Sequence, residues 1–209
     1  MAREVNQLHP WLQYKLEKLM KECKKQGLTV GIGECFRTVE EQNALYAQGR
    51  SRPGRVVTNA KGDSFSSQHQ WGIAVDLFQN IKGREWEEAF FRKVAKIAKS
   101  DEVGLGWGGD WSGFQDTPHF YLDKWGSTTK KLKAKYKNFE SFKKYWRRTT
   151  TIKCCLWSEN SLEKSISLTE IPSGAKVDVL FYSSLGYAKV KYKSLVGYLS
   201  RSVLEGVRC

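Results

Sequence analysis

The chain has 209 residues, of which 40% are hydrophobic and 27% charged, and its formal net charge is +13. This composition indicates a folded globular protein and excludes a disordered or fibrous chain. No stretch approaches the roughly 18 consecutive apolar residues of a membrane span. Residues 1–6 also lack the apolar core of a secretion signal, so we expect neither membrane insertion nor signal-directed export.

The five cysteines do not suggest a disulfide framework. Cys154 and Cys155 are adjacent, Cys209 is the last residue, and none of the five has zinc-finger spacing. An odd number of cysteines without such spacing is typical of reduced thiols in a protein made in a cytoplasm. We therefore do not expect cysteine chemistry to carry the function.

Helical and strand patterns alternate over the first 125 residues. Leu12, Leu16 and Leu19 lie on one face of a helix that starts at Pro10 and stops at Gly27. The predicted elements are a helix at 10–27, a strand at 28–32, a helix at 38–48, an irregular loop at 51–67, a strand at 73–78, a helix at 85–99, a Gly/Trp loop at 104–113 and a strand at 119–122. Together they predict an α+β domain over residues 1–125, with a small sheet and flanking helices.

The remaining chain divides into a connector and a second module. Residues 124–148 carry ten basic side chains and one acid, Glu140, so 126–150 reads as a basic helical linker. Such a surface attracts polyanions, although a charged run is more often a solvated face. Short strands at 177–181, 187–192 and 195–199, separated by turn residues, predict a small β-barrel over residues 151–209.

His69 and Asp76 are the first candidates for a metal site. Seven residues of strand would separate them by about 23 Å, so they can share a metal only if the chain folds back, which Gly72 would permit. Asp76 also lies in an apolar strand, where a carboxylate must be paired, hydrogen-bonded or bound to a metal. These residues alone leave a metal ligand and a hydrogen-bonded buried aspartate as equal alternatives.

His119 adds a third candidate ligand. Pro118 disfavours a helical conformation before it, so His119 is predicted to open a strand, with Asp116 on the preceding turn. Two histidines and one aspartate leave one zinc position open, as in catalytic sites. A carboxylate beside zinc-bound water can take its proton and return it to a leaving amine, and these roles suit amide hydrolysis. The third histidine, His9, precedes Pro10 at a helix start and reads as a cap or surface residue.

These motifs resemble a known family. The pattern Ser67-x-His69-x-x-Gly72-x-Ala74-x-Asp76, followed by Asp116-x-x-His119, is similar to the zinc peptidases that comprise L-Ala-D-Glu endopeptidases and D-Ala-D-Ala carboxypeptidases (VanY-like, LAS-type), especially phage endolysins. The resemblance covers about residues 5–123. It implies one Zn²⁺ in the catalytic domain, held by His69, Asp76 and His119.

The same resemblance implies roles for further residues. Asp116 matches the catalytic base, and aspartate rather than glutamate there favours the L-Ala-D-Glu endopeptidase branch. Arg37 matches an arginine that binds substrate or stabilises the oxyanion, as a guanidinium with parallel donors can. Ser67 and Gln42 match positions around the site and are expected to contact substrate.

The last 60 residues resemble bacterial SH3-like modules that bind cell walls. Three segments carry this resemblance: Gly174-x-Lys176-Val177, Tyr187-Ala188-Lys189-Val190 and Gly197-Tyr198-Leu199. The Arg-Ser-Gly-Pro stretch usual near the start of such a module is absent, which leaves the ligand open. Whether its aromatic residues form a binding groove, belong to the core or lie on the ordinary surface is open as well.

The sequence therefore predicts a peptidoglycan-degrading endolysin of a bacteriophage, with zinc-bound water as nucleophile and Asp116 as general base and acid. We expect it to be made in the host cytoplasm and to reach the wall after release by a membrane-permeabilising protein. Anionic wall polymers are further expected partners, nucleic acid is not, and the oligomeric state is open. The alternatives are a D,D-carboxypeptidase that releases terminal D-Ala, and a basic wall- or nucleic-acid-binding protein without catalysis.

Overall fold

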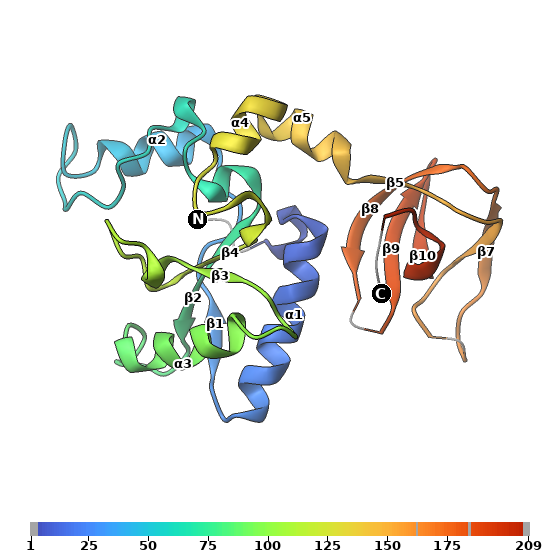
Figure 1. The fold of residues 1–209 in the computed structure, drawn as a ribbon, viewed down its shortest axis with the longest axis horizontal. Helices are drawn as coiled ribbons and strands as arrows, with labels where there is room; N and C mark the ends of the chain where they lie inside the picture. The colour runs from blue at the N-terminus through green and yellow to red at the C-terminus, as the bar shows by residue number, and fades with distance from the viewer. Residues whose placement is uncertain (1–3, 162, 184, 207–209) are drawn as a thin grey trace. The chain divides into compact units, whose positions relative to one another are not determined.

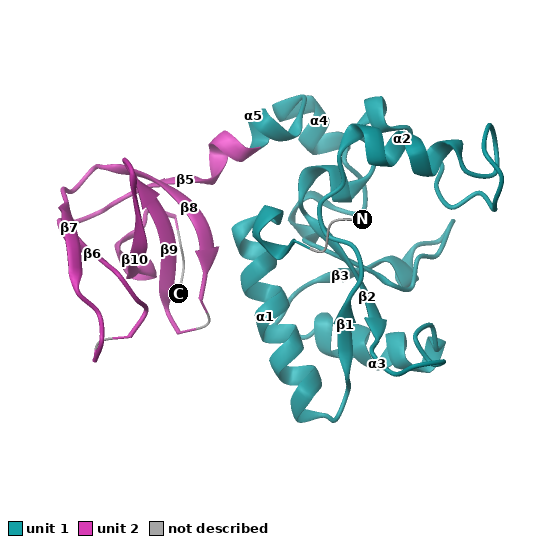
Figure 2. Ribbon diagram, turned by 180° about the vertical axis from the view of Figure 1, so that it is seen from behind, with its two compact units in different colours: residues 1–142 teal, residues 143–209 magenta. Residues whose placement is uncertain are grey.

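The structure, a computed structural model, describes residues 4–161, 163–183 and 185–206. The chain divides into two compact units, residues 1–142 and 143–209 (Figure 2). Over the described ranges, no helix has both the length and the apolar character needed to cross a membrane.

A four-stranded antiparallel sheet forms the centre of unit 1 (Figure 1). Its strand order is β1-β2-β4-β3, with β1 at Val30–Ile32, β2 at Ala74–Gln79, β3 at Gly106–Trp107 and β4 at His119–Tyr121. The strands predicted around β1, β2 and β4 are confirmed. The Gly/Trp segment expected as a loop instead supplies β3 and a single 3-10 turn, because Trp107 pairs with Phe120 of β4.

Three helices accompany this sheet, and all three were expected. They are α1 at Pro10–Lys25, α2 at Val39–Ala47 and α3 at Glu88–Ala98. The leucines of α1 point into the core, since Leu12 and Leu19 are fully buried. Helix α2 begins at a capping box in which the Thr38 hydroxyl accepts from the Glu41 N–H and the Glu41 carboxylate accepts from the Thr38 N–H. Short 3-10 turns lie at Val5–Gln7, Gly62–Ser64, Gln68–Trp71, Gly108–Asp110 and Asp123–Trp125.

Gly72 reverses the chain between the 3-10 turn Gln68–Trp71, labelled η3, and β2. Its φ is +62°, a conformation that L side chains rarely adopt. A Cβ atom there would also lie 2.8 Å from the carbonyl oxygen of Gln7. The predicted reversal at this glycine is therefore present, and it returns the chain from His69 to the strand that carries Asp76.

Two short helices, α4 at Lys130–Tyr136 and α5 at Phe139–Lys143, follow the sheet. The sequence led us to expect a linker over 126–150, but unit 1 extends to Phe142. The reason is aromatic packing: the Phe142 ring lies 5.9 Å from that of Trp71, and the Phe139 ring lies 4.4 Å from that of Phe36, between ring centroids. The lysines of α4 remain exposed while Leu132 and Tyr136 are buried.

This packing predicts a large loss of stability in Phe142→Ala. The side chain is 1% exposed and touches four other rings, so its removal leaves a cavity that should cost about 3–5 kcal/mol. Denaturant unfolding of unit 1 measures this cost. Glu140→Ala, an exposed change on the same helix, should alter stability by less than about 0.5 kcal/mol. Equal effects of the two substitutions would show that α5 is not part of this core.

Unit 2 is a six-stranded antiparallel sheet with the order β5-β8-β9-β10-β6-β7. Its strands are β5 at Arg147–Thr149, β6 at Cys154–Trp157, β7 at Ser167–Ile171, β8 at Lys176–Tyr182, β9 at Tyr187–Tyr192 and β10 at Leu195–Ser200. The three predicted strands correspond to β8, β9 and β10, whereas β5, β6 and β7 were missed. Between the described strands, β5 and β7 are the sheet edges and no pairing joins them, so the expected closed barrel is not seen. A single bridge from Thr150 to Leu204 ties the start of the unit to its end.

The four cysteines that the structure describes are free thiols, as expected. Cys23, Cys35, Cys154 and Cys155 form no disulfide. Burial raises the pKa of the Cys35 thiol to about 12, which makes it a poor nucleophile. Cys209 lies outside the described residues.

Candidate metal centre and active site

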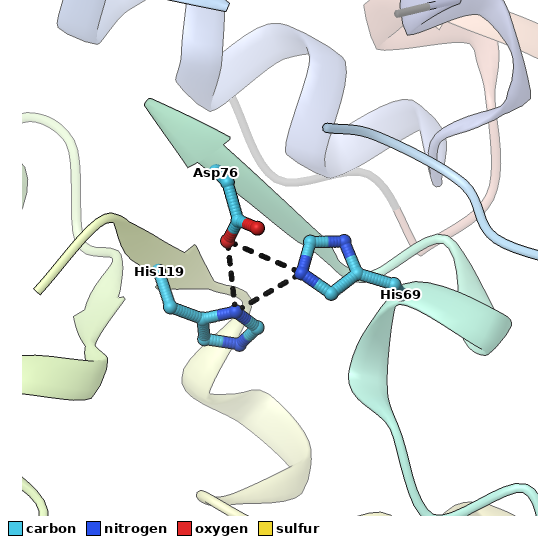
Figure 3. A group of neighbouring side chains, drawn as sticks. All are labelled: His69, Asp76 and His119. Atoms are coloured by element: carbon cyan, nitrogen blue, oxygen red, sulfur yellow. Dashed lines mark hydrogen bonds and ion pairs between the residues drawn. The ribbon is translucent and has the colours of Figure 1, made fainter. Parts of the chain in front are cut away.

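Three side chains from three different elements meet at one point in unit 1 (Figure 3). His69 comes from the turn η3, Asp76 from β2 and His119 from the start of β4. The His69 Nε2 atom lies 3.1 Å from His119 Nδ1, and both nitrogens lie 3.2 Å from Asp76 Oδ1. The structure thus brings together the three residues that the sequence singled out as metal ligands.

The strand register fixes two of these residues side by side. Asp76 and His119 are direct partners in the antiparallel pair β2–β4, so their side chains leave the sheet on the same face. The backbone of Asp76 is held from the other side too: its N–H donates to the Glu34 carbonyl and its carbonyl accepts from the Gly33 N–H, both at 2.8 Å. This pairing gives the carboxylate a rigid base.

Hydrogen bonds set the orientation of both imidazole rings. His69 Nδ1 donates to the Cys35 carbonyl at 2.7 Å, and His119 Nε2 donates to Gln68 Oε1 at 2.8 Å. Each ring therefore uses one nitrogen as a donor and turns the lone pair of the other toward Asp76. Three acceptor atoms then face one another, an arrangement that needs a proton or a cation between them.

The pKa shifts of the cluster point to the same need for positive charge. Burial acts to lower the pKa of His69, but the charge and hydrogen bond of Asp76 raise it above its usual value. Burial acts to raise the pKa of Asp76, but His69 and His119 outweigh it and hold that pKa well below its usual range. The carboxylate is thus ionised and the site as a whole favours a cation.

The cluster lies in a cleft of about 1210 Å³ within unit 1. Asp116 and Ser67, two of the predicted site residues, line the same cleft. Asp116 is half-buried, and no side chain of the described residues donates a hydrogen bond to its carboxylate. Burial raises the pKa of Asp116, with an opposing contribution from His119. A carboxylate so placed can exchange a proton with a molecule bound in the cleft.

Arg37 also lines the cleft, but its guanidinium is tied down from behind. Its Nε donates to Glu34 Oε1 at 2.7 Å, its second terminal nitrogen donates to Glu34 Oε2, and its first donates to Gln42 Oε1 at 2.7 Å. Gln42 is fully buried and is not among the residues that line the cleft; its amide also donates to the Ala60 carbonyl. The substrate contact expected of Gln42 stays a prediction; in the structure this side chain contacts Arg37.

Sequence reasoning missed two side chains of this site. Glu34 forms a buried ion pair with Arg37, and Gln68 orients His119. Glu34 stands three residues before Arg37, a spacing that could have suggested a pair, and Gln68 immediately precedes a candidate ligand. Neither signal identifies a partner without the fold, because both contacts depend on how loops meet around β2.

Comparison with known proteins connects this geometry to a family. A family described as D-alanyl-D-alanine carboxypeptidase, of the M15 peptidase type, matches residues 60–122, the stretch that contains all three clustered residues and Asp116. The chain is 34% identical over 126 residues to the peptidoglycan L-alanyl-D-glutamate endopeptidase CwlK of Bacillus subtilis (strain 168), which covers 55% of this chain and 73% of that protein.

Two further relatives complete the comparison. The L-alanyl-D-glutamate peptidase of Listeria phage A118 is 34% identical over 128 residues, which are 60% of this chain but only 41% of the phage protein. Among solved structures, the L-Ala D-Glu endopeptidase ChiX of Serratia marcescens is 21% identical with a TM-score of 0.40, covering 56% of this chain and 82% of that one. Because the match to CwlK spans most of that protein at 34% identity, the chain belongs to the M15-type peptidase family that includes the L-alanyl-D-glutamate endopeptidases.

Proposed function

We propose that the protein is a peptidoglycan hydrolase of the endolysin type, a zinc endopeptidase that cuts the amide between L-alanine and D-glutamate in the stem peptide. The observation that carries this proposal is the convergence of His69, Asp76 and His119 in a cleft that also presents Asp116. Both curated relatives described above are named for this bond, and both are 34% identical to the chain.

The three converging side chains suit zinc. Ligand atoms that lie about 2.0–2.1 Å from a tetrahedral zinc are about 3.3 Å from one another, and the observed separations are 3.1–3.2 Å. Two neutral imidazoles and one carboxylate are also a donor set typical of catalytic zinc, with a position left for substrate or water. A zinc ion held there would supply Lewis-acid polarisation of the scissile carbonyl and acidify a water molecule.

The chain's own groups supply the remaining steps of hydrolysis. Asp116 accepts the proton that the attacking water loses and returns it to the nitrogen of the leaving amine. Arg37, fixed by Glu34 and Gln42, presents positive charge to the carbonyl oxygen on which negative charge develops. Ser67 lies on the cleft wall next to Gln68 and contacts the substrate.

We assign unit 2, an SH3-like module in this proposal, to wall binding. The exposed lysines of α4, including Lys130, Lys131 and Lys133, add attraction to anionic wall polymers that should weaken as salt rises. The support is the concentration of basic residues and the resemblance of β8–β10 to such modules. In the same proposal the enzyme is made in the host cytoplasm and works on the wall after a membrane-permeabilising protein releases it.

Mass spectrometry of fragments from defined peptidoglycans tests the activity. We expect new N-terminal D-glutamate or D-isoglutamine and new C-terminal L-alanine, lost with a chelator and restored by Zn²⁺. The description of the matching family favours a second candidate, a carboxypeptidase, and release of free D-alanine alone would establish that reading instead. Wall binding without any cleavage would contradict both.

A further inference from the structure

We propose that Trp86 and Phe114 form a sugar-binding surface in the catalytic cleft, which holds the glycan next to the stem peptide. The inference rests on the proposed function and specifies how its substrate is held. Trp86 and Phe114 are each 67% exposed, and both line the cleft. The other large aromatic residue that is exposed in the described part of the chain, Tyr145, lies in unit 2.

Exposure of large aromatic rings calls for an explanation when they gather in a cleft. An indole or phenyl ring gains stability when it is removed from water, and exposed apolar groups that cluster in a concave site mark a ligand. Trp86 packs against two other aromatic residues: its ring centroid lies 6.5 Å from those of both Phe78 and Phe91. The indole thus has two aromatic neighbours in unit 1, of which Phe91 is buried, while Trp86 itself stays largely exposed.

Both rings are near the reacting groups along the chain. Trp86 lies in the segment between β2, which carries Asp76, and α3. Phe114 lies in the segment between η4, the turn Gly108–Asp110, and β4, two residues before Asp116. In Figure 1 this second segment and the loop that follows α2 project from the same side of unit 1. Residues of both segments line the cleft: Phe114 belongs to the segment before β4, and Val56 and Val57 belong to the loop after α2.

The chemistry of the substrate places a sugar close to the scissile bond. In peptidoglycan the L-alanine of the stem is joined to the lactyl group of N-acetylmuramic acid, so the glycan begins one residue from the scissile bond. One extended residue spans about 3.3–3.6 Å. A cleft of about 1210 Å³ is larger than most small-ligand sites, which measure roughly 300–1,000 Å³, and it has room for more than the two amino acids of that bond.

Aromatic rings are suited to a pyranose. The faces of the sugar ring and the methyl of its N-acetyl group are apolar, so they pack on a flat aromatic surface and release water. Basic side chains give no competing explanation for the exposed rings, since Arg37 is the one Lys or Arg among the cleft-lining residues described and is fixed by Glu34. An anionic ligand at the rings is disfavoured as well, because the same lining includes five carboxylates: Glu34, Asp76, Asp110, Asp116 and Asp123. The aromatic pair therefore fits the apolar face of a neutral sugar better than an anionic group.

Steady-state kinetics on two matched substrates tests the proposal. One is a stem peptide linked to the N-acetylglucosamine–N-acetylmuramic acid disaccharide, and the other is the same peptide capped by a lactyl group alone. We expect Trp86→Ala and Phe114→Ala each to raise KM for the disaccharide peptide roughly tenfold, with kcat nearly unchanged and with little effect on the lactyl peptide. Trp86→Tyr should restore most of the affinity. Tyr145→Ala is the matched control and should change neither value.

Two results would overturn the sugar contact. Equal weakening of both substrates would show that the rings touch the peptide, and unchanged kinetics would show that they touch neither. If the unaltered protein cleaves neither substrate, the proposed function fails. Calorimetric binding of the disaccharide peptide then decides the sugar contact separately: weaker binding in Trp86→Ala than in Tyr145→Ala supports it, and equal binding rejects it.

Discussion

Replacing Asp116 with asparagine is expected to reduce kcat by about 10²–10⁴ while metal content and KM stay near their original values. The amide of asparagine has the shape of the carboxylate but cannot take a proton from water. Asp116 lines the cleft, and no side chain of the described residues donates a hydrogen bond to its carboxylate. The carboxylate oxygens are therefore available for proton exchange. It is not one of the three converging side chains, and a metal should therefore still bind.

Asp110→Asn is the matched control for this prediction. Asp110 lines the same cleft and stands six residues earlier, but its carboxylate is paired with Lys99 at 2.8 Å and is half exposed. Its loss should leave kcat within a few-fold of the original, since a surface ion pair contributes only about 0–1 kcal/mol. Metal analysis and rate measurements on both variants are needed. Full activity of Asp116→Asn would remove Asp116 from the mechanism, and loss of metal would mean that its effect is indirect.

The metal cluster could be anticipated from the sequence because its signals are local. Gly72 marks the chain reversal between His69 and Asp76, and Pro118 marks the entry of His119 into a strand. The polar residue in an apolar strand, Asp76, then needs a partner. The hydrogen bonds that orient the two histidines could not be anticipated in this way. The Cys35 carbonyl and the Gln68 side chain that accept them lie in segments whose positions no short sequence pattern predicts.

The boundary between the units could not be read from composition for a physical reason. Residues 124–148 are dominated by lysines, which conceal the few apolar positions that decide where α4 and α5 pack. Leu132 and Phe142 are buried, and these side chains bind the segment to unit 1. In unit 2 the missed strands are short or contain a bulge, as between Leu156 and Trp157, so that their alternation is too weak to recognise.

His119→Ala should lower metal affinity by at least about a hundredfold, because even loss of a group that only orients a ligand costs 10–100-fold. Two of three donors would remain, and hydrolysis should fall to background. A chelator should do the same to the unaltered protein. Since a metal that binds only the folded state stabilises it, the chelator should also lower Tm of the unaltered protein and leave that of His119→Ala almost unchanged.

The chain's third histidine provides the control. His9 caps α1, where its Nδ1 accepts from the Trp11 N–H, and it is not part of the converging group. His9→Ala should lose more than the about 1 kcal/mol of its cap, because the ring also packs on Phe142 and Trp125, yet keep one metal per chain and the effect of the chelator on Tm. Metal content, activity and Tm measured on all three proteins separate the two roles. If His119→Ala keeps its metal and its activity, the convergence of His69, Asp76 and His119 serves the fold instead of a metal, and hydrolysis must depend on other groups in the cleft.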